Sequence, residues 1–208
     1  MVLLATVAIM AYVVYFLIKS YYSVDSSHVD ISDKKLLQLI DEERDGLMSI
    51  DRAMALTGMS KSQVKKRMSA LSMRYLVNTS YGSSFKYYYS LKQPLPQGPF
   101  PELSSDPFLT IGDLMTLFEH FDYKLTILDI VCATGLPVNV IGREMKYFIK
   151  EKIVDKISGH KPDGSGMVVS QYYILRGEYR DNPERYLTVK DTVNLDLSKL
   201  YAEHKLRD

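Results

Sequence analysis

The stretch TGMSKSQVKKRMSALSMRYLV at residues 57–77 returns 77 positions later as TGLPVNVIGREMKYFIKEKIV at residues 134–154. Both begin with Thr-Gly, a signal that ends a helix. Both continue with apolar residues at helical spacing, which are Val64, Met68 and Leu71 in the first stretch. The similarity extends over residues 33–92 and 110–176. Outside its N-terminal segment, the chain is therefore an internal duplication.

Each copy predicts three helices followed by a β-hairpin. In the first copy, strand signals at residues 76–79 and 85–89 flank a turn at residues 81–83, and in the second copy the hairpin turns through residues 159–166. Residues 93–109 carry five of the eight prolines and predict an extended, semi-rigid linker. The predicted first residues or caps of the helices are Asp33, Ser49 and Ser60 in the first copy and Thr110, Thr126 and Pro137 in the second.

This order of elements resembles the winged helix-turn-helix superfamily, without pointing to one family within it. The resemblance rests on the two quoted stretches and on the aromatic hairpin after each. It implies an α+β fold with two consecutive winged-helix domains, at residues 31–92 and 110–178. It also implies that the third helix enters a DNA major groove while the hairpin contacts the backbone or minor groove. Tandem winged helices also serve as protein-binding modules, so the surfaces must decide the function.

Residues 1–18, MVLLATVAIMAYVVYFLI, carry no charged side chain. As a helix they would span roughly 27 Å, close to a bilayer core of about 30 Å. We expect residues 1–22 to form a single transmembrane helix, with Lys19 favouring a cytoplasmic position for the domains that follow. A cleavable signal peptide fits poorly, because no cation precedes the apolar run and no small-residue cleavage site follows it. A buried core helix is the other alternative.

The formal net charge of +1 arises from 26 Lys and Arg against 25 Asp and Glu, and it excludes a uniformly basic nucleic-acid coat. The charges are unevenly distributed, however. Residues 31–97 contain eleven Lys and Arg against six Asp and Glu, whereas residues 106–179 contain eight against ten. We therefore expect the first copy to bind DNA more strongly than the second.

The third helix of each copy supplies the candidate DNA-binding residues. When its apolar stripe faces inward, cations and short polar side chains face outward, and these residue types contact phosphates and base edges. A solvated helix face and a basic face near anionic lipid headgroups are the alternatives. The predicted DNA-binding residues are Lys61, Ser62, Gln63, Lys65, Lys66, Arg67, Ser69 and Lys86 in the first copy, and Asn139, Arg143, Lys146, Lys150 and Lys161 in the second.

The sequence offers no pattern typical of catalysis, and we expect no enzyme activity, cofactor or metal. The four histidines have no paired ligand spacing, and a single cysteine, Cys132, lies in an apolar run. Residues 179–208 are predicted as a tail with a short helix through Val193, Leu197 and Leu200. This helix is expected to pack on its own domain or on a partner subunit.

Two functional hypotheses follow. The first is a membrane-anchored tandem winged-helix protein that binds duplex DNA as a transcriptional regulator, with its membrane contact through residues 1–18. The second is a non-enzymatic interaction or scaffold subunit of a membrane complex. A homodimer or partner subunits are compatible with both. Exposed third helices on one positive face would favour DNA, whereas third helices buried against each other or against the tail would favour docking.

Overall fold

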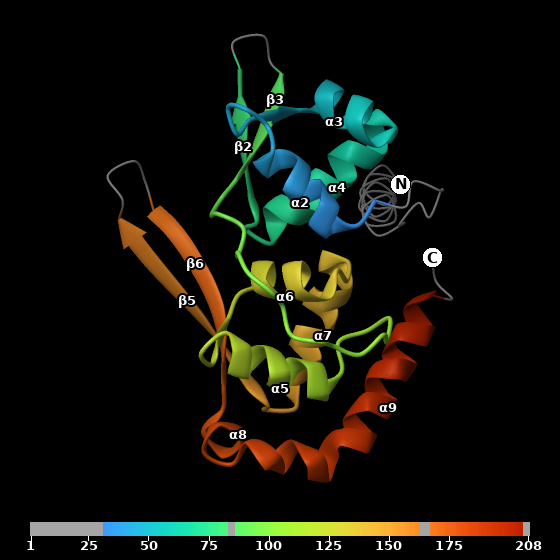
Figure 1. Cartoon of the computed structure of the whole chain (residues 1–208), viewed down its shortest axis with the longest axis vertical. Helices are drawn as coiled ribbons and strands as arrows, with labels where there is room; N and C mark the ends of the chain where they lie inside the picture. The colour runs from blue at the N-terminus through green and yellow to red at the C-terminus, as the bar shows by residue number, and fades with distance from the viewer. Residues whose placement is uncertain (1–30, 83–85, 163–166, 206–208) are drawn as a thin grey trace, which may run out of the picture.

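The computed structural model describes residues 31–82, 86–162 and 167–205. It is an α+β structure in which one order of elements, α-β-α-α-β-β, occurs twice (Figure 1). We call residues 33–91 the first repeat and residues 111–175 the second repeat. A helical tail follows the second repeat.

The first repeat contains α2 (Asp33–Asp41), β1 (Met48–Ser49), α3 (Ile50–Thr57), α4 (Lys61–Met73), β2 (Val77–Tyr81) and β3 (Tyr87–Leu91). The second repeat contains α5 (Ile111–His120), β4 (Lys124–Leu125), α6 (Ile127–Thr134), α7 (Val138–Lys150), β5 (Val154–Pro162) and β6 (Met167–Leu175). The tail contains α8 (Gly177–Asp181), the 3-10 helix η1 (Pro183–Arg185) and α9 (Tyr186–Lys205).

The ends of the helices follow local sequence signals. The hydroxyls of Ser49, Ser60, Thr110 and Thr126 accept backbone N–H groups at the starts of α3, α4, α5 and α6. Both α3 and α6 end at a glycine in the left-handed conformation, with φ of 71° at Gly58 and 70° at Gly135. The predicted cap at Asp33 is wrong. Ser32 caps α2 instead, and the Asp33 carboxylate makes tertiary contacts.

Each repeat has a three-stranded antiparallel sheet, in the order β1-β3-β2 in the first and β4-β6-β5 in the second. The two-residue strands β1 and β4 were not predicted, because a run that short has no period-2 pattern. The second hairpin is longer than predicted, since β5 continues to Pro162 and β6 begins at Met167. The registers match between repeats: Thr79 pairs with Tyr89 in the first, and Lys156 with Tyr173 in the second.

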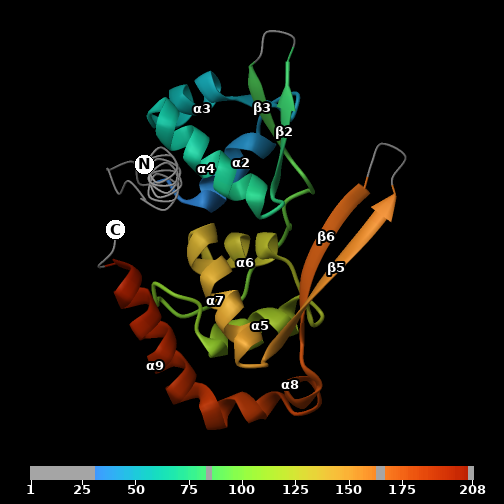
Figure 2. The same ribbon diagram turned by 180° about the vertical axis from the view of Figure 1, so that it is seen from behind.

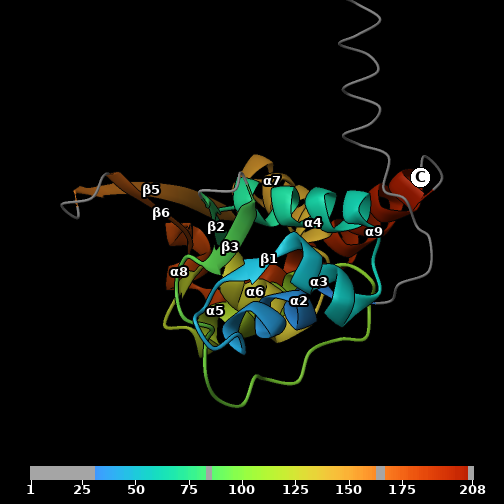
Figure 3. The ribbon, with the colours of Figure 1, turned by 90° about the horizontal axis from the view of Figure 1, so that it is seen from above.

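The two repeats share one hydrophobic core and touch through their helices. The side chains of Val64 and Met68 on α4 and of Ile141 and Phe148 on α7 are completely buried. The third helices α4 and α7 are in contact and lie along the same side of the molecule (Figure 3), which faces the viewer in Figure 2. The distance and the angle between α4 and α7 are therefore fixed by their packing in this shared core.

The segment at residues 93–109, predicted as an extended, semi-rigid linker, has no helix or strand and is bound to the second repeat. The N–H of Leu109 donates to Oε2 of Glu144 at 2.8 Å, and Leu109 itself is buried. The N–H and hydroxyl of Ser104 both donate to the carboxylate of Asp113, at 2.7 and 2.6 Å. These contacts bind the linker to the second repeat, so it cannot adjust the spacing of the repeats as a flexible chain would.

The tail is dominated by α9, a helix of 20 residues rather than the short helix predicted. Its Val193 and Leu197 side chains are buried, and it packs against α5 (Figure 1). Oδ1 of Asn194 accepts the N–H of Ile111 at 3.1 Å, which satisfies a donor in the first turn of α5. The tail is thus part of the second repeat's structure.

The predicted transmembrane helix at residues 1–22 lies outside the described residues. Within residues 31–82, 86–162 and 167–205, no helix is both long enough and apolar enough to cross a membrane.

Candidate nucleic-acid interface

The outer face of α4 is open and carries only neutral polar and cationic groups along its first two turns. The inner face buries Val64, Met68 and Leu71, and this orientation exposes Ser62 and Lys65 on the opposite side. Lys61 and Ser69 are also exposed, while Lys66 is half-buried. The helix contains no Asp or Glu, so no carboxylate on α4 competes for these cations.

Gln63 has a structural role that sequence reasoning did not assign. It forms a capping box with Ser60, in which Oε1 of Gln63 accepts the N–H of Ser60 at 2.8 Å. This box fixes the start of α4 and satisfies backbone donors that the helix cannot satisfy itself. The side-chain oxygen of Gln63 is engaged there and does not point freely to solvent.

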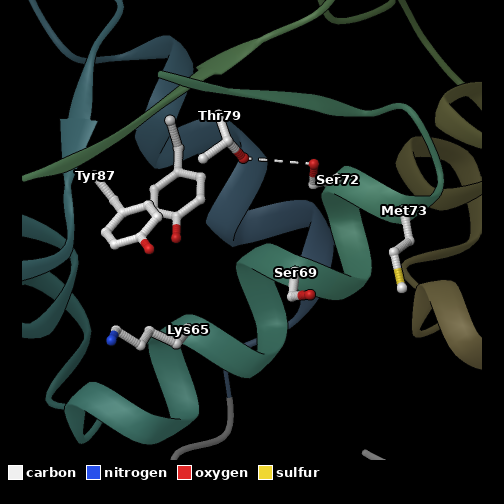
Figure 4. A pocket seen from close by; sticks show the side chains of 7 residues that line it. Lys65, Ser69, Ser72, Met73, Thr79 and Tyr87 are labelled. Carbon is white, nitrogen blue, oxygen red and sulfur yellow. Dashed lines mark hydrogen bonds between the residues drawn. The ribbon is translucent and has the colours of Figure 1, made fainter. Parts of the chain in front are cut away.

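A shallow hollow of about 280 Å³ lies between α4 and the β2–β3 hairpin (Figure 4). None of its seven lining residues is acidic. The Lys65 ammonium lies 5.7 Å from the centroid of the Tyr87 ring, a cation–π arrangement. The hollow therefore combines a cation, hydroxyls and aromatic rings. Its lining residues are Lys65, Ser69, Ser72, Met73, Thr79, Tyr87 and Tyr89.

The hairpin extends the cationic face beyond α4. Lys86 is exposed, and its ammonium is 4.0 Å from Oδ2 of Asp51, which is also exposed. An ion pair this open contributes little free energy, so Lys86 can exchange Asp51 for another anion at low cost. Close by, the rings of Tyr81 and Tyr87 lie 4.8 Å apart.

Arg67 does not belong to this face. Its guanidinium donates to Oδ1 of Asp33 at 2.6 Å and also to the carbonyl oxygen of Ile31. The second oxygen of Asp33 accepts the N–H of Val138, the first residue of α7, at 2.8 Å. Asp33 is buried and so links α2, α4 and α7. The structure gives Arg67 a role in joining the two repeats that the sequence did not predict, and its contact with DNA stays a prediction.

The corresponding face of α7 is partly covered. Asn139, Lys146 and Lys150 are exposed, as expected for outward positions. Arg143 is only 18% exposed, because it pairs with Glu144 at 2.9 Å and its guanidinium lies 5.8 Å from the Tyr201 ring of α9. The structure therefore does not present Arg143 as an open cation.

Helix α9 also holds Tyr147 of α7. The Tyr147 hydroxyl donates to Oδ2 of Asp196 at 3.2 Å. Burial and the Asp196 carboxylate raise the pKa of Tyr147 to about 12, which keeps this phenol a neutral donor.

Lys161 lies on β5, but its side chain falls outside the described part of the structure. Of the predicted residues on the second repeat, three are thus open to solvent.

Two cations outside the predicted set lie near the junction of the repeats. Arg74 follows the last turn of α4, and its guanidinium lies against the backbone of α7 at Gly142. Lys156 on β5 is close enough to Arg74 and Lys146 to be repelled by both. Alignment of the two repeats places Lys156 at the position of Thr79 and Gly142 at that of Lys65. Comparing the residues at aligned positions could have identified Lys156 and the glycine that Arg74 contacts.

The described residues show no arrangement suited to catalysis by a metal or a thiolate. No group of three or more His, Cys, Asp or Glu among them could hold a metal ion. Cys132 is buried, and desolvation raises the pKa of its thiol to about 11. A thiol of that pKa is a poor nucleophile at neutral pH.

Comparison of the chain with protein-family models, with curated proteins and with solved structures gave no match.

Proposed function

We propose that this chain is a membrane-anchored, tandem winged-helix protein that binds duplex DNA as a transcriptional regulator, mainly through α4. The observation that carries this proposal is the outer face of α4, which is exposed, free of carboxylates and flanked by a cationic hairpin. In the winged-helix arrangement this is the face that enters the major groove. In this proposal the first repeat binds DNA through its helix-turn-helix and its hairpin. The second repeat holds α4 in place through α7.

The dimensions of α4 suit this role. Thirteen residues make a helix about 20 Å long, and a helix 10–12 Å in diameter fits a major groove about 12 Å wide. Ser62, Lys65 and Ser69 would face base edges, whereas Lys61, Lys66 and Lys86 would contact phosphates. With a few lysines and hydroxyls, most of the binding energy would come from contacts to the DNA phosphate backbone, and little of the base sequence would be recognised.

The contact between the repeats argues against a binding mode in which each repeat occupies its own half-site. Two independent half-sites would require both third helices to enter grooves about 34 Å apart. Here α4 and α7 touch, and α9 covers part of α7. We therefore propose that the protein occupies one continuous duplex site, centred on α4.

The second repeat also supports a different function, that of a protein-docking module. The observation in its favour is that α7 contacts α4 and α9 instead of standing free. In that case α4 would bind a partner subunit of a membrane complex. A stable complex that forms without nucleic acid, recovered in mild detergent and abolished by changes on α4, would favour this alternative over DNA binding.

The membrane part of the proposal rests on the charge-free segment at residues 1–18. A cytoplasmic position for the repeats follows from Lys19 and would give them access to DNA. With this anchor, the protein would search for its site from the membrane surface.

The double variant Lys65→Gln/Lys66→Gln tests the DNA-binding role of α4. We expect binding to a random duplex to be at least tenfold weaker near 0.1 M salt. The slope of the logarithm of the binding constant against the logarithm of the salt concentration should become shallower by about two, because two phosphate contacts are lost. Gln retains helix propensity and side-chain length, so the fold should be unaffected. The measurement is fluorescence anisotropy of the full chain in nonionic detergent.

The control is Lys190→Gln, which removes one exposed cation from α9, away from α4. It should leave both affinity and salt dependence close to wild type. No duplex binding by the wild-type chain at low salt, or equal binding by the α4 double variant, would overturn the proposed function.

A further inference from the structure

The second repeat has its own counterpart of the hollow beside α4. Superposing the repeats by sequence places Gly142 at the position of Lys65, Lys146 at that of Ser69 and Lys156 at that of Thr79. The sheet registers agree, because Lys156 pairs with Tyr173 as Thr79 pairs with Tyr89. At this position, between α7 and the β5–β6 hairpin, the second repeat carries two lysines where the first repeat has Ser69 and Thr79.

Arg74 of the first repeat enters this region of the second. Its guanidinium lies so close to Gly142 that a Cβ there would collide with it. Glycine inside a helix lowers its stability relative to alanine, so its presence in α7 calls for a packing reason. Gly142 is buried, and the room it leaves is taken by the side chain of Arg74. The junction therefore places a third cation beside Lys146 and Lys156.

Within the part of the chain that the structure describes, these three cations have no anionic partner. No ion pair among the described residues involves Arg74, Lys146 or Lys156. The nearby carboxylate of Asp155 is paired with Arg176 at 3.1 Å, and Lys150 is paired with Glu151. Desolvation, Arg74 and Lys146 lower the pKa of Lys156, in that order of importance. Like charges gathered in this way destabilise the fold unless an anion joins them.

We propose that Arg74, Lys146 and Lys156 form a binding site for a phosphate group, which we call the junction site. A forked guanidinium and two ammonium groups are the donors that phosphate oxygens prefer. The source is the backbone of the duplex bound by α4, so this inference rests on the proposed function. Because α4 and α7 lie along one side of the molecule (Figure 3), a duplex against α4 continues over the junction site.

The double variant Arg74→Gln/Lys156→Gln tests the junction site. We expect its duplex binding to weaken about tenfold near 0.1 M salt. The slope of the logarithm of its binding constant against the logarithm of the salt concentration should become shallower by about two. In the absence of DNA, Lys156→Gln should raise the melting temperature at low salt, because it relieves repulsion. The melting curve also shows that the variants fold. Lys190→Gln serves as the control with one cation fewer elsewhere.

The outcomes separate the junction site from the proposed function. If the wild-type chain binds duplex and Arg74→Gln/Lys156→Gln keeps the same salt dependence, the junction site is overturned while α4 binding stands. If the wild type binds no duplex but inorganic phosphate raises its melting temperature more than that of the double variant, the site stands with free phosphate as its source. Absence of both effects overturns both proposals.

Discussion

At the scale of single residues, Asp33 and Arg67 show how a side chain can be predicted for one role and serve another. The helical spacing of Val64, Met68 and Leu71 correctly predicted that these side chains of α4 are buried, because that spacing is a local pattern. Arg67 lies on the flank of the same helix, where periodicity does not decide between solvent and a neighbour. Its partner Asp33 is 34 residues away in sequence, and no local signal marks that pairing.

Replacing Arg67 with Met should lower the free energy of unfolding by about 3 kcal/mol, because the buried carboxylate of Asp33 loses its cationic partner. Duplex affinity of the folded protein should change less than twofold. The neighbouring variant Lys66→Met should show the reverse pattern, with little change in stability and weaker DNA binding. Urea denaturation followed by far-UV circular dichroism measures the first quantity, and loss of DNA binding in Arg67→Met without loss of stability would refute the structural role.

Glu144 should make stability depend on pH. It is completely buried, and desolvation raises its pKa above the ordinary value of 4.5, against the opposing effects of the Leu109 N–H and Arg143. The folded protein then binds more protons than the unfolded chain between 4.5 and the raised pKa. Glu144 therefore contributes a loss of stability as pH rises through this window.

Glu144→Gln keeps an acceptor for the Leu109 N–H and removes the charge. We expect the difference in unfolding free energy, variant minus wild type, to become more favourable as pH rises from about 4 to 7. Urea midpoints measured across this range would show it. A difference that is flat or falls with pH would mean that the buried carboxylate is already stabilised as an anion.

At the scale of elements, the local signals account for the helices better than for the strands and the tail. Hydroxyl caps and the Thr-Gly stops delimit α3, α4 and α6 because these groups bond within one turn. The strands β1 and β4 exist only through pairing with β3 and β6, which no local pattern encodes. Likewise, the length of α9 depends on its packing against α5, so a few apolar positions indicated a helix but understated its extent.

Two leucines of α9 provide a matched test of that packing. Leu197 is completely buried, whereas Leu195 is 55% exposed. Leu197→Ala should lower the free energy of unfolding by about 3 kcal/mol, and Leu195→Ala by less than about 0.5 kcal/mol. Equal small effects in thermal or urea denaturation would show that α9 does not pack on the second repeat in solution.

At the scale of the whole molecule, the duplication was visible in the sequence but the inequality of the repeats was only partly so. The uneven net charge correctly singles out the first repeat as more basic. It does not show that Arg74 reaches α7, that the linker is bound to Asp113 and Glu144, or that α9 covers Arg143. These contacts join distant segments, and together they leave α4 as the more open third helix.

Placing a probe on α4 tests the central claim most directly. Cys132 is buried with a raised pKa, so a thiol-directed photo-crosslinker can be attached selectively at Ser62→Cys on α4 or, as control, at Glu203→Cys on the tail. Irradiation with labelled duplex at low salt should crosslink DNA to the α4 variant and not to the tail variant. No adduct at Ser62→Cys, or equal adducts at both positions, would contradict DNA binding through α4.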